Sequence, residues 1–200
     1  MKRVICGDDF CFGRNRQGTP DILKKMAPEL GYDVEVVPRI VHGRDFISST
    51  RIRKDLLEGS INDANACLGY TFPIEGYIVH GRHLGEKWGF PTANIVPGPE
   101  KLLPRYGVYG VRAEIDGKEF NGIANIGVKP TVSDDKTAML EVHVFDMERD
   151  LYGKRMKVLF DTFIRPEQRF ESKKALIRQV KKDIKSALEY QTMKGIEKND

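Results

Sequence analysis

Residues 80–94 bring together the backbone and side-chain features that phosphate chemistry uses. The segment holds three glycines, then a hydroxyl and a carboxamide: Gly81, Gly85, Gly89, Thr92 and Asn94. Glycines let backbone N–H groups approach phosphate oxygens closely, and the side-chain oxygens of threonine and asparagine are hard ligands that suit Mg²⁺. The spacing fits neither a Walker A loop nor the dinucleotide-binding fingerprint. A phosphate site is therefore one interpretation, and glycines that form ordinary turns in a β-rich protein are the other.

A carboxylate on a predicted strand is the candidate for acid–base chemistry. In the segment Met139–Phe145, Glu141 alternates with the apolar residues Leu140 and Val142. Successive side chains of a strand point to opposite faces, so Glu141 can face a site while its neighbours fill the core. The alternative is an outward, solvated glutamate. His80, His83 and His143 fit no metal-ligand spacing, and we expect them to be turn or strand residues.

The elements that position these residues change in character near residue 70. Up to Gly69 the pattern predicts α/β structure. The expected elements are a strand at Val4–Cys6, a helix that begins after Thr19 and ends at Gly31, a strand at Asp33–Val37, a helix capped within Ser48-Ser49-Thr50 that runs to Glu58, and a further helix capped by Ser60.

Between Thr71 and Ile164 the pattern predicts antiparallel β structure. The clearest element is a hairpin of Val108–Ile115 and Glu119–Ile126 around the turn dipeptide Asp116-Gly117. Further strands are expected at Ile74–His80, Met139–Phe145 and Lys154–Ile164, the last with Met156, Val158, Phe160, Thr162 and Ile164 in alternation. Strands at this spacing favour a small barrel. A helix at Ser172–Tyr190 carries Leu176, Val180, Ile184 and Leu188, and we expect this apolar stripe to pack on the barrel.

Composition restricts the classes of function. The 33 Lys and Arg residues against 29 Asp and Glu give a net charge of +4 without a basic block, so neither nucleic-acid binding nor membrane-surface binding is indicated. The three cysteines suggest neither a disulfide framework nor a zinc site. No apolar run approaches the roughly 18 residues that span a bilayer, and the N-terminus does not resemble a signal peptide. We expect a cytoplasmic protein.

The segment Gly89–Asn94 (GFPTAN) resembles the signature of riboflavin kinases. The similarity continues in the same order through GVYG at 107–110, NIGVKPT at 125–131, LEVH at 140–143, DLYG at 150–153 and IRPEQRF at 164–170. It covers roughly Gly69 to Tyr190. The resemblance implies a six-stranded antiparallel barrel with a C-terminal helix, so we expect a mostly β protein with a kinase barrel at 70–190 and a polar tail at 191–200.

The resemblance also implies site roles. Thr92 and Asn94 would hold Mg²⁺ with the ATP phosphates, and the backbone from Gly81 to Phe90 would wrap the nucleotide. Glu141 would be the general base that accepts the proton of the riboflavin 5′-hydroxyl, and the products would be FMN and ADP. The residues expected on the ATP side are Gly81, Gly85, Gly89, Phe90, Pro91, Thr92 and Asn94, and those on the flavin side are Arg165 and Phe170. One departure is Glu86, where many relatives carry arginine.

Residues 1–69 resemble the second half of the FMN adenylyltransferase domain of bacterial bifunctional riboflavin kinase/FAD synthetases, a partial Rossmann-like fold. The similarity rests on GDDFCFG at 7–13 and ISSTRIR at 47–53, in which Ser48, Ser49, Thr50 and Arg51 would be a vestigial phosphate-binding motif. The HxGH motif of such enzymes is absent from these residues. We therefore expect no FAD synthesis, and an incomplete fragment that can pair with another chain. A non-catalytic flavin- or nucleotide-binding module and a residual adenylyltransferase are the alternatives.

Overall fold

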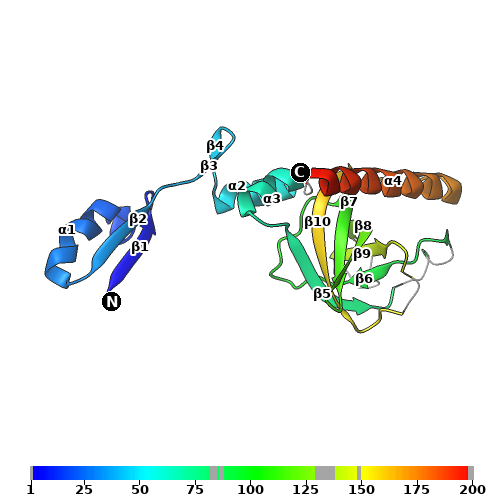
Figure 1. The fold of residues 1–200 in the computed structure, drawn as a ribbon, viewed down its shortest axis with the longest axis horizontal. Helices are drawn as coiled ribbons and strands as arrows, with labels where there is room; N and C mark the ends of the chain where they lie inside the picture. The colour runs from blue at the N-terminus through cyan, green and yellow to red at the C-terminus, as the bar shows by residue number, and fades with distance from the viewer. Residues whose placement is uncertain (1, 82–84, 86–87, 129–137, 148–149, 198–200) are drawn as a thin grey trace. The chain divides into compact units, whose positions relative to one another are not determined.

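The computed structural model describes residues 2–81, 85, 88–128, 138–147 and 150–197. The chain forms two compact units, Met1–Ser48 and Ser49–Asp200, and each is described here by itself. Figure 1 shows the path of the chain through both units. Arg82, His83, Leu84, Glu86 and Lys87 of the glycine-rich segment lie outside the described residues, as do Lys129, Pro130 and Thr131 of the NIGVKPT block.

The first unit is a small α/β element. Strands β1 (Arg3–Gly7) and β2 (Asp33–Val37) pair in parallel, and helix α1 (Pro20–Leu30) connects them. The Thr19 hydroxyl accepts a hydrogen bond from the Ile22 backbone N–H and caps the helix, as the sequence predicted. The short 3₁₀ helix η1 (Arg14–Arg16) and the hairpin of β3 (Val41–His42) with β4 (Asp45–Phe46) complete the unit.

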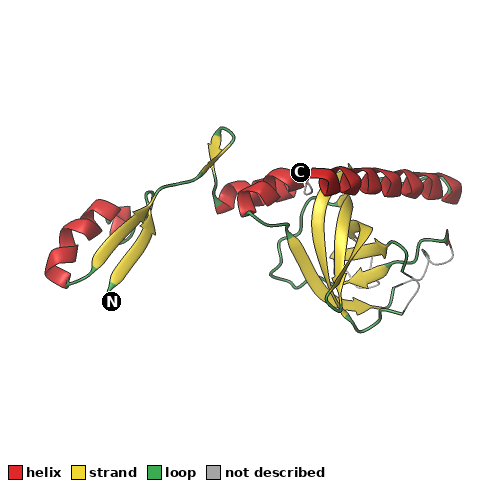
Figure 2. Ribbon diagram, in the orientation of Figure 1, coloured by secondary structure: helices red, strands yellow, loops and turns green. Residues whose placement is uncertain are grey.

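The second unit is built around a closed six-stranded barrel, as predicted. Its strands are β5 (Pro73–Val79), β6 (Ala93–Ile95), β7 (Gly107–Ile115), β8 (Lys118–Val128), β9 (Ala138–Val144) and β10 (Arg155–Pro166). They follow the order β10-β5-β6-β9-β8-β7 around the barrel, and every neighbouring pair is antiparallel (Figure 2). Closure leaves no free edge strand, so register is fixed all the way round.

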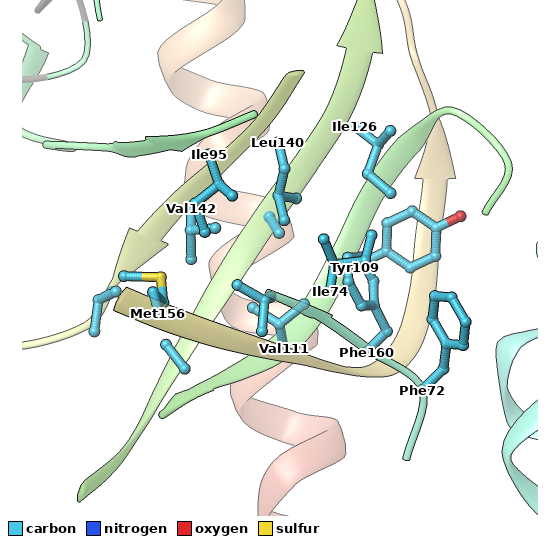
Figure 3. Packing of buried hydrophobic residues seen from close by; sticks show 14 of the residues in the cluster. Phe72, Ile74, Ile95, Tyr109, Val111, Ile126, Leu140, Val142, Met156 and Phe160 are labelled. Atoms are coloured by element: carbon cyan, nitrogen blue, oxygen red, sulfur yellow. The ribbon is translucent and has the colours of Figure 1, made fainter. Parts of the chain in front are cut away.

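Apolar side chains from all six strands fill the barrel interior. Figure 3 shows Ile74, Ile95, Val111, Leu140 and Phe160 among them, and each is almost completely buried. Tyr109 lies with them, edge-on to the Phe160 ring at a centroid distance of 5.1 Å. The interior is thus packed with side chains, and the outer face of the barrel is the surface on which a ligand site can form.

Helices α2 (Ser49–Glu58) and α3 (Ile61–Leu68) belong to the barrel unit, although we predicted a boundary after residue 69. Leu56, Ile61 and Ala64 are buried in the same apolar cluster as the barrel core. The Asn65 carboxamide donates to the Phe160 carbonyl and accepts from the Phe72 N–H. Both helices therefore pack on the barrel, which their own apolar faces require.

Helix α4 (Lys173–Glu197) lies across the outer face of β7, β8 and β10 (Figure 1). The predicted stripe is only partly correct, because Leu188 is 44% exposed. The predicted stripe repeats every four residues, and each such step advances about 40° around the helix. The end of the stripe therefore turns away from the barrel, and Asp183 and Ala187 are the residues buried against it. The helix also continues past Tyr190, and the Gln191 carboxamide donates to the Val111 carbonyl. None of the helices among the described residues is long and apolar enough to cross a membrane.

Candidate active site

A cavity of about 390 Å³ lies outside the barrel, between its strands, the loop before β6, and the start of α4. The loop and strands contribute Gly85, Trp88, Phe90, Thr92, Asn94, Val108, Ile123, Ala124, Asn125, Glu141 and His143. The segment after β10 and helix α4 contribute Arg165, Glu167, Gln168, Phe170, Leu176, Ile177, Val180 and Asp183. Seven of the residues predicted from the sequence therefore share one cavity: Gly85, Phe90, Thr92, Asn94, Glu141, Arg165 and Phe170.

Three polar residues form a row across neighbouring strands at the base of this cavity. Glu141 on β9 pairs with Asn94 on β6 and with Asn125 on β8. Residues opposite one another on antiparallel strands have Cβ atoms about 5 Å apart, so the carboxylate lies between two carboxamides. Asn94 is 4% exposed, while Glu141 is half-buried and reachable from the cavity. The strand alternation predicted for Glu141 is present, since Leu140, Val142 and Val144 are buried on the other face.

His143 joins strand β9 to the loop that precedes β6. Its Nδ1 atom lies 2.8 Å from the Pro91 carbonyl oxygen, and the Phe90 ring meets the imidazole edge-on at 5.8 Å. A carbonyl oxygen can only accept, so Nδ1 carries the proton and Nε2 is the remaining ring nitrogen. The spacing of the histidines predicts a turn or strand residue here and no metal ligand. No local pattern indicates the contact with Pro91, because it joins residues 52 positions apart.

Close approach of the backbone explains two of the glycines in the loop. A Cβ atom on Gly81 would lie 2.2 Å from Asn94 Nδ2, and a Cβ atom on Gly85 would lie 2.3 Å from the Phe90 carbonyl oxygen. Neither position can hold a larger residue without movement of its neighbour. Gly81, Gly89 and Pro91 do not line the cavity, and of these Gly81 packs directly against the Asn94 side chain.

The flavin-side candidate Arg165 is held by an acidic partner that the sequence did not indicate. Its Nε and Nη2 atoms donate to Asp183 at 3.0 and 2.8 Å, and Nη1 donates to the Pro166 carbonyl at 3.1 Å. The guanidinium lies 5.6 Å from the centroid of the Phe170 ring. Arg165 therefore lines the cavity, and Asp183 largely balances its positive charge.

The cavity lining combines a polar group and an apolar group of side chains, and the charged residues Arg165 and Asp183 lie beside the apolar group. Thr92, Asn94, Asn125 and Glu141 gather at the strands β6, β9 and β8. Apolar side chains come from α4 and the strands beneath it: Val108, Ile123, Leu176, Ile177 and Val180. Such a division suits a ligand with a flat apolar part and a polar part that reacts.

Comparison with known proteins places this geometry in a family. The riboflavin kinase family profile matches residues 68–191, which is more than half of the chain. The chain belongs to the riboflavin kinase family. The polar row and the glycine-rich loop both lie within the matched residues.

Relatives of this riboflavin kinase family member carry a second activity in their names. The bifunctional riboflavin kinase/FMN adenylyltransferase of Listeria monocytogenes is 36% identical over 92% of the chain, and that of Pseudomonas fluorescens is 40% identical over 94%. The chain spans 58% and 60% of their respective lengths. A crystal structure described as a macrolide-efflux protein from Streptococcus pneumoniae matches 90% of the chain with a TM-score of 0.82 and 34% identity, and the chain covers 58% of it.

The FAD synthetase family profile matches residues 1–51 of this riboflavin kinase family member. The predicted motif lies at the end of that match: Ser48 closes the first compact unit, while Ser49, Thr50 and Arg51 begin α2 in the second. Arg51 Nε lies 3.7 Å from Asp55 Oδ2, one turn further along the helix. None of the four residues lines the cavity.

Proposed function

We propose that this chain transfers the γ-phosphoryl group of ATP to the 5′-hydroxyl of riboflavin, giving FMN and ADP. The observation that carries the proposal is the row Asn94–Glu141–Asn125 in a cavity that apolar side chains also line. Family membership supplies the reaction class, and the row supplies candidates for the groups that perform it.

Thr92 and Asn94 are the proposed ligands of the magnesium ion that accompanies ATP. Both present neutral oxygens to the cavity, and Mg²⁺ combines few protein oxygens with phosphate oxygens and water. The donor set fits such an ion, because a hydroxyl oxygen and a carboxamide oxygen line one cavity two residues apart in the chain. The bound ion would offset the negative charge that develops on the transferred phosphoryl group.

Glu141 is the proposed general base. Its carboxylate lies one strand away from Asn94, so a hydroxyl that hydrogen-bonds to Glu141 would face a phosphate bound at Thr92 and Asn94. The carboxylate would accept the hydroxyl proton as the oxygen attacks phosphorus, which contributes typically 10²–10⁴-fold to a rate. Asn125, on the other side of Glu141, is placed to donate its amide N–H to the same carboxylate or to the substrate.

The apolar part of the cavity lining is the proposed site of the flavin ring system. Ile123, Val108 and Val180 offer an apolar surface from two strands and α4, and Phe170 lines the same cavity. Burial of a flat aromatic ring here removes about 25 cal/mol of unfavourable hydration per Å² of apolar surface. The ribityl chain would then reach the polar row.

A chromatographic assay tests the proposal. The protein is incubated with riboflavin, ATP and Mg²⁺, and riboflavin, FMN and FAD are separated and quantified. We expect FMN as the product, a loss of at least about 100-fold in Glu141→Gln, and normal turnover in Glu114→Gln, a glutamate on β7 outside the cavity.

Three results would contradict parts of this proposal. Riboflavin binding without turnover would indicate a binding module instead. Normal turnover in Glu141→Gln would remove the general-base assignment. FAD among the products would contradict our expectation that the 200-residue chain makes FMN alone.

A further inference from the structure

Two buried aspartates lie beneath helix α4, and each is paired with an arginine of a neighbouring strand. Asp183, on α4, accepts hydrogen bonds from Arg165 of β10 at 2.8–3.0 Å. Asp161, on β10, accepts from Arg112 of β7 at 2.8 and 3.1 Å, and from Lys194 of α4 at 2.6 Å. Both aspartates are 1% exposed, so each carboxylate is removed from water, while the arginines stay partly exposed. The two pairs are thus similar in chemistry and in burial.

The two aspartate–arginine pairs differ in their position relative to the cavity. Asp183 and Arg165 line the cavity, whereas Asp161 and Arg112 do not. Arg165 also donates to the Pro166 carbonyl and lies over the Phe170 ring, which ties the guanidinium to both ends of the segment after β10. Residues within that segment form part of the cavity wall.

Asp183 is in turn held by its own helix. The Gln179 carboxamide donates to Asp183 Oδ1 at 2.9 Å, so that oxygen accepts from two donors. A bidentate carboxylate–guanidinium pair fixes the plane of the guanidinium as well as its position. A change at Asp183 would therefore alter where Arg165 points, and with it the segment that Arg165 holds.

We propose that Asp183 is a positioning residue for flavin binding: through Arg165 it holds the segment Pro166–Phe170 in the geometry that accepts the isoalloxazine ring. The inference rests on the proposed function, because it assigns the substrate of that cavity. Asp183 itself does not react. Removal of its charge leaves the Arg165 guanidinium without its partner in a mostly buried place, and the guanidinium must turn toward water. The Pro166 and Phe170 contacts are then lost together.

The test compares Asp183→Asn with Asp161→Asn, which neutralises the same residue type in the matching pair outside the cavity. For each protein we would measure the KM for riboflavin, the KM for ATP, kcat, the thermal midpoint, and the Kd for riboflavin from quenching of flavin fluorescence. We expect Asp183→Asn to raise the riboflavin KM and Kd at least about tenfold, which corresponds to about 1.4 kcal/mol of binding free energy, with an unchanged KM for ATP. Asp161→Asn should lower the thermal midpoint and leave both KM values as in the wild type.

Equal riboflavin KM values in the two variants would overturn the inference, as would a rise in the ATP KM of Asp183→Asn. Should Asp183→Asn not fold, Asp183→Glu decides the matter, because it keeps the charge but moves the carboxylate by one methylene group and so disturbs the bidentate geometry with Arg165. A raised riboflavin Kd in that variant supports the inference, and an unchanged one overturns it. Wild-type protein that binds riboflavin without forming FMN would refute the proposed phosphoryl transfer, while the Kd comparison would still decide the role of Asp183.

Discussion

Gly81→Ala offers the sharpest test of how the glycine-rich loop supports the proposed metal site. A Cβ atom at this position would lie 2.2 Å from Asn94 Nδ2, 2.7 Å from Cγ and 3.0 Å from Oδ1. Ordinary van der Waals contact begins at 3.4 Å, so the nearest atom must move by about 1.2 Å. Gly81 has no positive φ angle, so alanine strains no backbone dihedral, and the Asn94 side chain bears the whole displacement.

Because Asn94 is a proposed Mg²⁺ ligand, this displacement should appear in the metal and nucleotide dependence of the reaction. A misplacement of about 1 Å can cost about 100-fold, so we expect kcat/KM for Mg-ATP to fall by roughly that factor. The Mg²⁺ concentration for half-maximal rate should rise, while the Kd for riboflavin should not change. Initial rates of FMN formation over a grid of Mg²⁺ and ATP concentrations provide the measurement.

Gly98→Ala is the matched control, since an added Cβ atom there meets nothing within 4 Å and the residue has no positive φ angle. It should retain wild-type kinetics. Normal Mg²⁺ dependence in Gly81→Ala, together with a defect in Asn94→Ala, would show that the loop tolerates the methyl group and that the packing argument is wrong. Normal kinetics in both variants would remove Asn94 from the metal site.

Three further outcomes are expected. Thr92→Ala should raise the Mg²⁺ requirement in the same assay without changing the riboflavin Kd. Asp161→Asn should lower the free energy of unfolding in urea, because Arg112 and Lys194 both lose a buried anionic partner. The loss should be smaller than the roughly 3–5 kcal/mol of an isolated buried pair, since Arg112 keeps its pair with Glu119. Burial raises the pKa of Tyr109, with a smaller opposing effect of Arg105. The unfolded chain then releases this proton first, so stability should fall as pH rises above about 10. If the urea midpoint of Tyr109→Phe depended on pH as strongly as that of the wild type, the assignment of this pH dependence to Tyr109 would be wrong.

The parts of the fold that were predictable from sequence are those fixed by neighbouring residues. The hairpin of β7 and β8 turns at Asp116 and Gly117, whose φ angles of 52° and 72° are those of the predicted type I′ turn. The placement of Glu141 on the outer face followed from its alternation with apolar residues, because the side-chain period of a strand is two. Barrel closure agreed with the spacing of the strands.

The parts that were not predictable depend on contacts between distant segments. The burial of Asp183 could not be predicted from the sequence, since a charged residue on a charged helix is usually solvated. Its burial depends on the pair with Arg165, which belongs to another element. The end of α4 also departs from the predicted stripe of apolar residues. Leu188 is exposed while Gln191 and Lys194 hydrogen-bond to the barrel, so polar contacts fix the end of this helix.

The alternation predicted for β10 also fails beyond Phe160, and this failure shapes the cavity. The pairing of β10 with β7 shifts between Phe160 and Thr162 and again between Phe163 and Arg165. The first irregularity turns Thr162 to the outer face, where it packs against Gly110 beneath α4.

Phe163 is consequently free to turn inward and meet the Tyr109 ring at 5.1 Å. The second irregularity returns Arg165 to the outer face opposite Val108, beside Asp183. Each bulge adds one residue that the partner strand does not match, so a period of two cannot reveal it. Two bulges together shift the alternation by two residues, so the inward and outward order beyond them is unchanged. Arg165 therefore faces the same cavity as Glu141, which lies three strands away.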